Sequence, residues 1–285
     1  MLIEVKGNSG CTINIVQNDD MLTVHKSTFD SKYIHRLVSQ ANKQISAVLT
    51  ENINVPHIHD VVVKDDNATI IMDYIHARNF VDFIEQSPIS AIDNFVSSII
   101  AYIDKELELS QESIISSDVF TQKINSILCN ANNNTFTSDN MTCLIKDSYE
   151  VFNKRGDIRL PIGVCHGDLT LSNILFASNK YYLIDFLDSF IETPIQDIVK
   201  LRQDTSYMWS LQMYNKQYDS IRIKTVFDYI DSEIDYYFNS TCKYYKESYQ
   251  YIQLINMLRI VPYAKSYTVA SYLENVITSL LGKLK

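Results

Sequence analysis

The side chains best suited to chemistry lie in one short stretch, residues 166–173, which reads HGDLTLSN, and in an aspartate that follows it. Asp168 and Asn173 stand five positions apart, and Asp185 comes twelve positions after Asn173, at the end of an apolar segment. Phosphoryl transfer depends mainly on positioning and on stabilising dense negative charge. One carboxylate can orient a hydroxyl group and accept its proton, while a second carboxylate and an amide oxygen are ligands that Mg²⁺ prefers. The spacing therefore indicates phosphoryl transfer; the alternative is that these residues are only turn and cap residues.

This stretch resembles the catalytic loop of the aminoglycoside phosphotransferase and choline kinase family, which is related to the protein kinases. Protein kinases have H-R-D in this loop and D-F-G further on, whereas the small-molecule branch typically has H-G-D, as here. The resemblance implies that Asp168 is the catalytic base and that Asn173 and Asp185 bind Mg²⁺. It also implies that ATP is the phosphoryl donor and that His166 braces the loop without reacting.

Three charged residues follow the motif, at positions 188, 197 and 202. By the same resemblance, Asp197 ties the next helix to the catalytic loop, and an ordinary helix N-cap is the alternative. Asp188 lies just beyond D-F-L, the counterpart of D-F-G, and contact with substrate, contact with metal and exposure to solvent all stay open. Arg202 is a candidate for a position near the cleft.

The N-terminal segment contains candidates for binding the nucleotide. Gly7 and Gly10 lie between two predicted strands, where backbone N–H groups can cradle phosphates, although an ordinary hairpin turn explains them equally well. Lys26 ends the third predicted strand, the place from which the family's lysine contacts the α- and β-phosphates. The segment containing Asp73 and Ile75 resembles the family's hinge, whose backbone binds adenine.

One departure from the family concerns the partner of this lysine. Kinase-like enzymes pair it with a glutamate on the next helix, but no acidic residue occurs between Ser31 and Thr50. Gln40 and Gln44 stand where the glutamate is expected, and an amide oxygen accepts a hydrogen bond without the strength of an ion pair. A pseudokinase that binds nucleotide or a partner protein therefore stays the alternative to an enzyme.

The elements around these residues predict an α+β fold with two lobes, similar to that of protein kinases. Short β-rich segments at residues 2–5, 11–16 and 22–26 precede a helical pattern from residue 33 to 48, for which Asp30 is a candidate N-cap. Two more strands are predicted at 60–63 and 68–74. We expect a nucleotide-binding lobe over residues 1–76 and a catalytic and substrate lobe over residues 77–285.

The larger lobe is expected to be mainly helical. Helical patterns cover residues 80–153 and the chain from Pro194 onward, where tyrosine clusters indicate helix packing. Between them we predict a short strand at 164–166 and a hairpin formed by 173–176 and 181–185.

Composition excludes several classes of function. The net charge is −9, without a Lys/Arg run longer than two, so binding to nucleic acid or to an anionic membrane surface is not expected. The five cysteines are widely spaced and form no CxxC pair, which fits a reducing cytoplasm. Neither a signal-peptide pattern nor an apolar run long enough for a membrane span occurs. His57 and His59 have no evident third metal ligand, and the oligomeric state stays open.

The phosphoryl acceptor is expected to be a small hydroxylated molecule, because no platform for a peptide follows Asp185 before helix resumes at Pro194. A sugar, polyol or hydroxy acid is the first expectation, and by analogy with bacterial relatives it would serve surface-polysaccharide precursor synthesis. Choline or ethanolamine is the second, because Tyr207 and Trp209 are candidates for an aromatic cage, with helix core as their alternative role. An aminoglycoside is also compatible with an acidic lobe. A choice between ATP and GTP is not encoded in these motifs.

Overall fold

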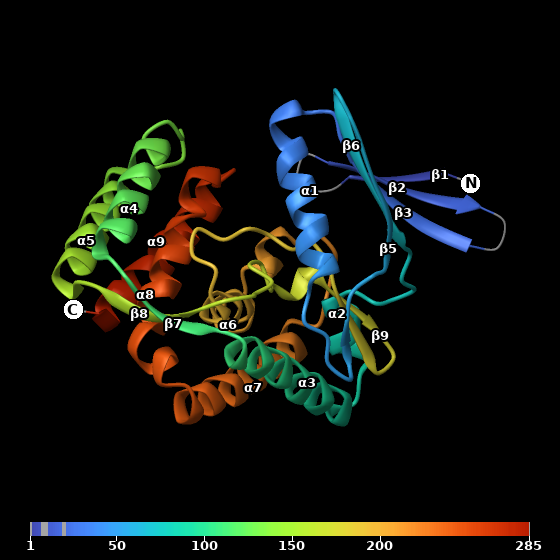
Figure 1. Ribbon diagram of the computed structural model, residues 1–285. Coiled ribbons are helices and arrows are strands. Elements are labelled where there is room, and N and C mark those ends of the chain that lie inside the picture. Colours follow the sequence, from blue (N-terminus) through green and yellow to red (C-terminus); the bar gives the residue numbers. More distant parts are fainter. Residues whose placement is uncertain (1, 7–10, 19–20, 285) are drawn as a thin grey trace.

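A five-stranded antiparallel sheet forms the N-terminal part of the computed structural model, which describes residues 2–6, 11–18 and 21–284 (Figure 1). In order across the sheet, the strands are β1 (Leu2–Lys6), β2 (Thr12–Asn18), β3 (Met21–Thr28), β6 (Asn67–Asp73) and β5 (Ile58–Lys64). Helix α1 (Ser31–Ile45) packs against β3, β5 and β6. The predicted strands and helix of this segment are therefore present.

Helix α1 begins where the sequence predicted. The Asp30 side chain accepts a hydrogen bond from the backbone N–H of Lys32 at 3.0 Å, so it caps the helix. Leu37 and Ala41 on one face of α1 pack with Ala68 and Ile70 of β6 in a small core. This packing fixes the rotation of α1 and therefore decides which of its polar residues face the strand that carries Lys26.

A short strand that was not predicted links the N-terminal segment to the rest of the chain. Strand β4 (Ile53–Asn54) pairs in parallel with β10 (Lys180–Leu183), which in turn forms the predicted hairpin with β9 (Ile174–Ala177). A two-residue strand has no periodic pattern, and its partner lies far along the sequence. Local sequence reasoning therefore had no signal for it.

Eight helices form the C-terminal part within the described residues: α2 (Phe80–Gln86), α3 (Ile89–Glu108), α4 (Ser117–Ala131), α5 (Asp139–Arg155), α6 (Pro194–Thr205), α7 (Ser220–Thr241), α8 (Lys243–Leu258) and α9 (Tyr267–Leu284). Short 3₁₀ segments occur at Leu171–Asn173, Ser210–Met213 and Val261–Tyr263. One large apolar core joins these helices to the β9–β10 hairpin, where the rings of Phe83 and Phe176 stack with centroids 4.2 Å apart. Tyr245 and Tyr249 are buried in this core, as expected for helix packing.

Two predictions about strands in this part were wrong. The region expected to be helical contains strand β7 (Gln111–Ile115), which pairs with β8 (Ile158–Ile162). β7 is a mostly exposed edge strand with a distant partner, so it lacks the alternation of buried and exposed residues that would have separated it from the helical segments on either side. Residues 164–166 form no strand, because the Asp197 carboxylate, rather than a neighbouring strand, accepts the backbone N–H of His166.

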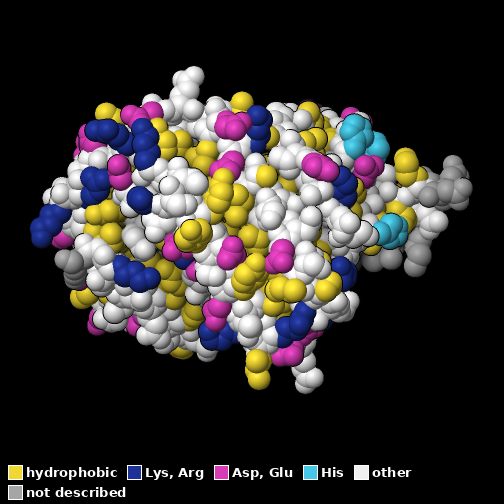
Figure 2. All heavy atoms as spheres, turned by 90° about the horizontal axis from the view of Figure 1, so that it is seen from below, with side chains coloured by type: hydrophobic (Ala, Val, Ile, Leu, Met, Phe, Trp, Pro, Cys, Tyr) yellow, Lys and Arg dark blue, Asp and Glu magenta, His cyan; other side chains and the backbone are white. Residues whose placement is uncertain are grey.

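The predicted α+β arrangement, with a small sheet-rich part followed by a larger helical part, is confirmed. Across residues 2–6, 11–18 and 21–284, no helix combines the length and apolar character needed to cross a membrane. On the face shown in Figure 2, basic, acidic and apolar side chains of the described residues are interspersed. The sheet-rich part and the helical part meet at the residues that the sequence singled out.

Candidate active site

The loop at residues 166–168 is held by a buried carboxylate. Asp197, in the first turn of α6, accepts hydrogen bonds from the backbone N–H groups of His166 and Gly167, the latter at 2.7 Å. Gly167 has φ +85°, and a Cβ atom there would lie 2.0 Å from the carbonyl oxygen of Leu187. The H-G-D sequence therefore has a steric cause, because only glycine fits both this backbone conformation and this contact.

His166 braces the loop, as the resemblance implied. Its ring is buried and lies between two backbone groups: Nε2 is 2.9 Å from the carbonyl oxygen of Ile184, and Nδ1 accepts the N–H of Asp168 at 3.2 Å. Burial lowers the pKa of His166 to about 4, so the ring is neutral at physiological pH. A neutral ring with Nε2 protonated satisfies both contacts, which joins the loop to the end of β10.

Asp168 has a different polar partner on each side. Asn173 Nδ2 donates to Asp168 Oδ2 at 3.1 Å and to its carbonyl oxygen at 2.8 Å, and Lys200 Nζ lies 3.0 Å from Asp168 Oδ1. Burial raises the pKa of Asp168, but the charge and hydrogen bond of Lys200 outweigh it, and the net pKa is below the usual value. Asp168 is therefore ionised at neutral pH, as a group that accepts a hydrogen bond from a hydroxyl must be.

Lys26 and Asp185 form an ion pair across the junction of the two parts. Their Nζ and Oδ1 atoms are 2.7 Å apart, and Lys26 also donates to Gln40 Oε1 at 3.1 Å. Gln44 is not the partner, because its amide donates to the carbonyl oxygen of Pro56. Gln40 therefore occupies the position expected for the family's helix glutamate, while Asp185 provides the carboxylate.

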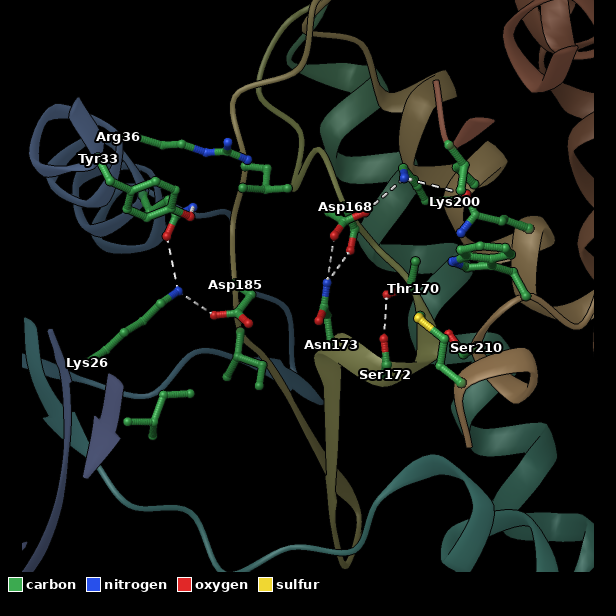
Figure 3. A pocket seen from close by; sticks show the side chains of 18 residues that line it. Lys26, Tyr33, Arg36, Asp168, Thr170, Ser172, Asn173, Asp185, Lys200 and Ser210 are labelled. Atoms are coloured by element: carbon green, nitrogen blue, oxygen red, sulfur yellow. Dashed lines mark hydrogen bonds and ion pairs between the residues drawn. The ribbon is translucent and has the colours of Figure 1, made fainter. Parts of the chain in front are cut away.

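These residues line one cavity of about 450 Å³, a size within the range of about 300–1,000 Å³ usual for ligand sites. Figure 3 shows Lys26 and Asp185 on one side, Asp168 and Asn173 in the middle and Lys200 beyond them. Ile13 of β2 and Ile184 add apolar surface, and Trp209, Ser210 and Met213 line it from the segment after α6. The cavity thus joins four of the predicted site residues: Lys26, Asp168, Asn173 and Asp185.

The donor set fits Mg²⁺ bound together with phosphate oxygens. Asp185 offers a carboxylate, and the two hydrogen bonds of the Asn173 NH₂ group to Asp168 leave the amide oxygen of Asn173 directed elsewhere. Within the described part of the chain, no group of three or more His, Cys, Asp or Glu side chains forms a metal cage. Mg²⁺ usually takes one or two protein ligands and completes its shell with phosphates and water.

Two other predicted residues lie away from the cavity, and two more are outside the described residues. Gly7 and Gly10 are outside the described residues, and Asp73 and Ile75 at the end of β6 do not line this cavity. The backbone N–H of Asp73 donates to His57, and its carboxylate lies 2.8 Å from His59 Nε2. The roles of these four residues toward the nucleotide stay predictions.

Two open questions about charged residues have structural answers. Asp188 accepts a hydrogen bond from the Ser39 hydroxyl at 2.7 Å and does not line the cavity. Arg202 points away from it and binds Asp231 on α7. The expected position of Arg202 near the cleft is therefore wrong.

The aromatic cage proposed for choline is also not assembled. Trp209 lines the cavity, but Tyr207 lines a different one beside Arg202. A quaternary ammonium group needs several aromatic faces at one point, and these two residues do not provide them.

Sequence reasoning missed the role of Lys200, although a signal was present. Asp197, Lys200 and Asp204 are spaced three and four positions apart, so they share one face of α6. Each of them binds the catalytic loop: Asp197 at His166 and Gly167, Lys200 at Asp168, and Asp204 at the N–H of Leu171 (2.7 Å). A polar stripe on a predicted helix next to a catalytic motif would have indicated this.

Comparison with known families agrees with this geometry. The model of the phosphotransferase enzyme family matches residues 145–222, which contain the catalytic loop, Asp185 and Lys200. The predicted family resemblance is confirmed. The matched family is one of phosphotransferase enzymes, so the predicted enzyme class is confirmed at the level of a phosphotransferase. No curated protein matches the sequence.

Solved structures of this kind share the fold over nearly the whole chain. Aminoglycoside phosphotransferase APH(4)-Ia, as a thermostable mutant with AMP-PNP and hygromycin B, has a TM-score of 0.64 and 9% identity, with 99% of this chain and 93% of that chain covered. A protein assigned as a fructosamine-3-kinase from Thermobifida fusca has a TM-score of 0.64 and 14% identity, and the match covers 99% of this chain and 93% of that chain. The gentamicin complex of APH(2")-IIa has a TM-score of 0.61 and 14% identity, and the match covers 99% of this chain and 91% of that chain. At these identities the likeness shows the phosphotransferase fold.

Proposed function

We propose that the protein transfers the γ-phosphoryl group of ATP, with Mg²⁺, to a hydroxyl group of a small molecule. The observation that carries this proposal is the meeting of Lys26, Asp168, Asn173 and Asp185 around one cavity. They come from β3, the catalytic loop and the end of β10, and together they supply two carboxylates, an amide and a lysine to one opening. Solved relatives of this fold hold AMP-PNP or ADP, which supports a nucleotide donor.

In this proposal each side chain has a distinct task. Asp168 accepts the proton of the acceptor hydroxyl as its oxygen bonds to the γ-phosphorus, and the bond from phosphorus to the β,γ-bridging oxygen breaks to release ADP. Lys26 donates to phosphate oxygens of the nucleotide. Mg²⁺, held by Asp185 and the Asn173 amide oxygen, would neutralise phosphate charge. Lys200 keeps Asp168 ionised and oriented until the hydroxyl proton arrives.

The same site supports a proposed division of the chain into two lobes. We propose that residues 1–76 form the nucleotide-binding lobe and residues 77–285 the catalytic lobe. Lys26 and Gln40 reach the cavity from the first segment, and Asp168, Asn173 and Asp185 reach it from the second. A nucleotide between the two lobes would then contact both.

The pseudokinase alternative rests on the missing helix glutamate and on D-F-L in place of D-F-G. In the structure Lys26 has a carboxylate partner, Asp185, and an amide partner, Gln40, so the lysine is positioned without that glutamate. Leu187 contributes its backbone N–H to the carbonyl oxygen of His166 at 3.0 Å, which stabilises the loop. Both departures therefore fit an enzyme.

The test is ADP release from Mg·ATP across sugars, polyols, hydroxy acids, amino alcohols and aminoglycosides. Asp168→Asn is expected to lower acceptor-dependent turnover by about a thousandfold or more, because the base is lost, while nucleotide binding changes little. Asp185→Ala is expected to weaken Mg·ATP binding as well. Normal turnover by Asp168→Asn would refute the mechanism, and nucleotide binding without turnover of any acceptor would favour the pseudokinase.

A further inference from the structure

A second cavity, of about 470 Å³, continues the catalytic one. Tyr33, Arg36, Lys200 and Ile260 line both cavities, so the two are contiguous. Most residues that line the second cavity come from α1, from α4, and from the end of α8 with the segment after it. Figure 1 shows α1 and α4 on opposite sides of the molecule's upper part. A molecule with its hydroxyl at Asp168 would extend into this space.

The charge of this cavity is opposite to that of the whole chain. Arg36, Lys123, Lys200 and Arg259 line it, and its lining contains neither Asp nor Glu. The chain as a whole has a net charge of −9. Four cations around one opening in an acidic protein create a local positive potential, which attracts anionic ligands.

Within the described residues, protein carboxylates do not neutralise most of these cations. Lys200 pairs with Asp168, but no Asp or Glu oxygen of those residues lies within 4.0 Å of Arg36, Lys123 or Arg259. Arg259 Nη1 is buried and has no hydrogen-bond partner in that part of the chain. Buried charged donors are normally paired, so an unpaired guanidinium beside a cavity favours an anionic partner from outside the protein.

The cations also stand close enough to repel one another. Arg259 and Lys123 both lie over the ring of Phe190, at 5.6 Å and 5.9 Å from its centroid. Burial lowers the pKa of Arg259, and Arg36 lowers it further, whereas the charge of Asp168 acts in the other direction. Burial and the charge of Arg259 likewise lower the pKa of Lys123. An oxyanion between them would relieve this repulsion.

From this arrangement we infer that the phosphoryl acceptor carries an oxyanion, a carboxylate or a phosphate, which Arg36, Lys123 and Arg259 bind while its hydroxyl faces Asp168. The inference rests on the proposed function and narrows its acceptor to hydroxy acids, sugar acids or sugar phosphates. Arginine suits both anions, since its planar group donates two parallel hydrogen bonds to either. A polycationic aminoglycoside or choline would be repelled by the same residues.

The test compares neutral, anionic and cationic ligands that are built on the same carbon skeleton. Binding of glycerol, glycerate and glycerol 3-phosphate, and of glucose, gluconate, glucose 6-phosphate and glucosamine, is measured by calorimetry on the protein with Mg·AMP-PNP. In at least one series the anionic member is expected to bind about tenfold or more tightly than its neutral counterpart. Whichever of the carboxylate and phosphate ligands binds more tightly identifies the oxyanion that the cavity prefers.

Substitutions then assign the preference to this cavity. Lys123→Gln with Arg259→Gln is expected to reduce the anion's advantage to about threefold or less, and Lys123→Gln alone, on a partly exposed residue, to reduce it in part. Lys146→Gln, an exposed lysine on the neighbouring helix α5, is the matched control and should leave the advantage unchanged.

Three outcomes would overturn the inference: equal binding of neutral and anionic members, no anion binding at all, or an advantage that survives in the double variant. Asp168-dependent ADP release with a neutral or cationic acceptor would leave the kinase proposal intact and refute only the anion preference. Anion binding without ADP release from any acceptor would refute the kinase proposal instead.

Discussion

At the scale of single residues, Glu106 is a buried acid that the proposed reaction does not use. It lies on α3 and is fully buried, close to the side chains of Tyr102 and Asp197. Burial, followed by the nearby charge of Asp197, raises the pKa of Glu106 well above its usual value. Glu106 is therefore still protonated at pH values at which a surface glutamate is ionised. In its neutral form it does not repel the nearby Asp197 carboxylate.

Glu106→Gln is expected to gain stability relative to the parent protein as pH rises above about 4.5. Because the folded pKa is raised, unfolding the parent releases a proton, so this group's stabilisation is complete below the unfolded pKa and is lost as pH rises toward the folded pKa. The difference in unfolding free energy should grow by about 1.4 kcal/mol per pH unit in that window. Urea denaturation at pH 5, 6 and 7 measures it.

The exposed Glu108→Gln on the same helix serves as the control for this experiment. Its effect is expected to stay within about 0.5 kcal/mol at each pH. A difference for Glu106→Gln that stays flat from pH 5 to pH 7 would contradict a raised pKa.

At the scale of elements, the contact between helix α6 and the catalytic loop decides the geometry of the site. Asp197, Lys200 and Asp204 hold the loop from one face of α6, and at Gly167 the loop also makes a close backbone contact with Leu187. The helix is buried along most of its length, so the polar stripe is fixed in place by apolar packing around it. The position of Asp168 therefore depends on the loop keeping its tight conformation.

Gly167→Ala tests this dependence, with Gly156→Ala as a matched control. Both glycines have positive φ, +85° and +71°, but only at Gly167 would a Cβ atom meet another group, at 2.0 Å. Gly156→Ala is expected to cost about 1–2 kcal/mol from backbone conformation alone and to keep full specific activity. Gly167→Ala is expected to cost more than about 3 kcal/mol and to abolish turnover.

Thermal unfolding and ADP release measure the two effects. Equal losses of stability in the two variants would show that the contact with Leu187 is unimportant. Retained turnover in Gly167→Ala would show that Asp168 tolerates a displaced loop.

At the scale of the whole molecule, ion pairs join segments that are distant in the sequence. Lys43 of α1 donates to the carbonyl oxygen of Leu187 at 2.6 Å and pairs with Glu192, which joins the N-terminal part to the segment after β10. Arg202 joins α6 to α7 through Asp231, at 2.7 Å, and through Asp235. The first pair lies beside the cavity, whereas the second stabilises the helical part behind it.

Arg202→Met is therefore expected to reduce stability without altering the chemistry. It leaves the mostly buried Asp231 without its cation, which costs about 3–5 kcal/mol. Lys224→Met breaks the exposed pair with Asp228 on α7 and should cost about 0.5 kcal/mol or less. Denaturation curves compare the two. A large fall in the specific activity of folded Arg202→Met would instead place Arg202 in the site.

The residues that meet at the cavity, the order of most elements and the phosphotransferase resemblance could be predicted from local sequence. The H-G-D-x₄-N motif, the Asp30 cap and the 174–183 hairpin each depend on residues a few positions apart, and short-range spacing records such relations directly. The choice of Gln40 over Gln44, the pairing of β4 with β10, and the ion pair of Lys200 with Asp168 were decided only by tertiary structure.

The charge of the second cavity was also decided only by tertiary structure. Arg36, Lys123 and Arg259 come from three distant segments, and the net charge of −9 concealed the basic surface that they form together. Spacing along the chain carries no information about such a set, because the packing of α1, α4 and α8 brings these side chains to one opening.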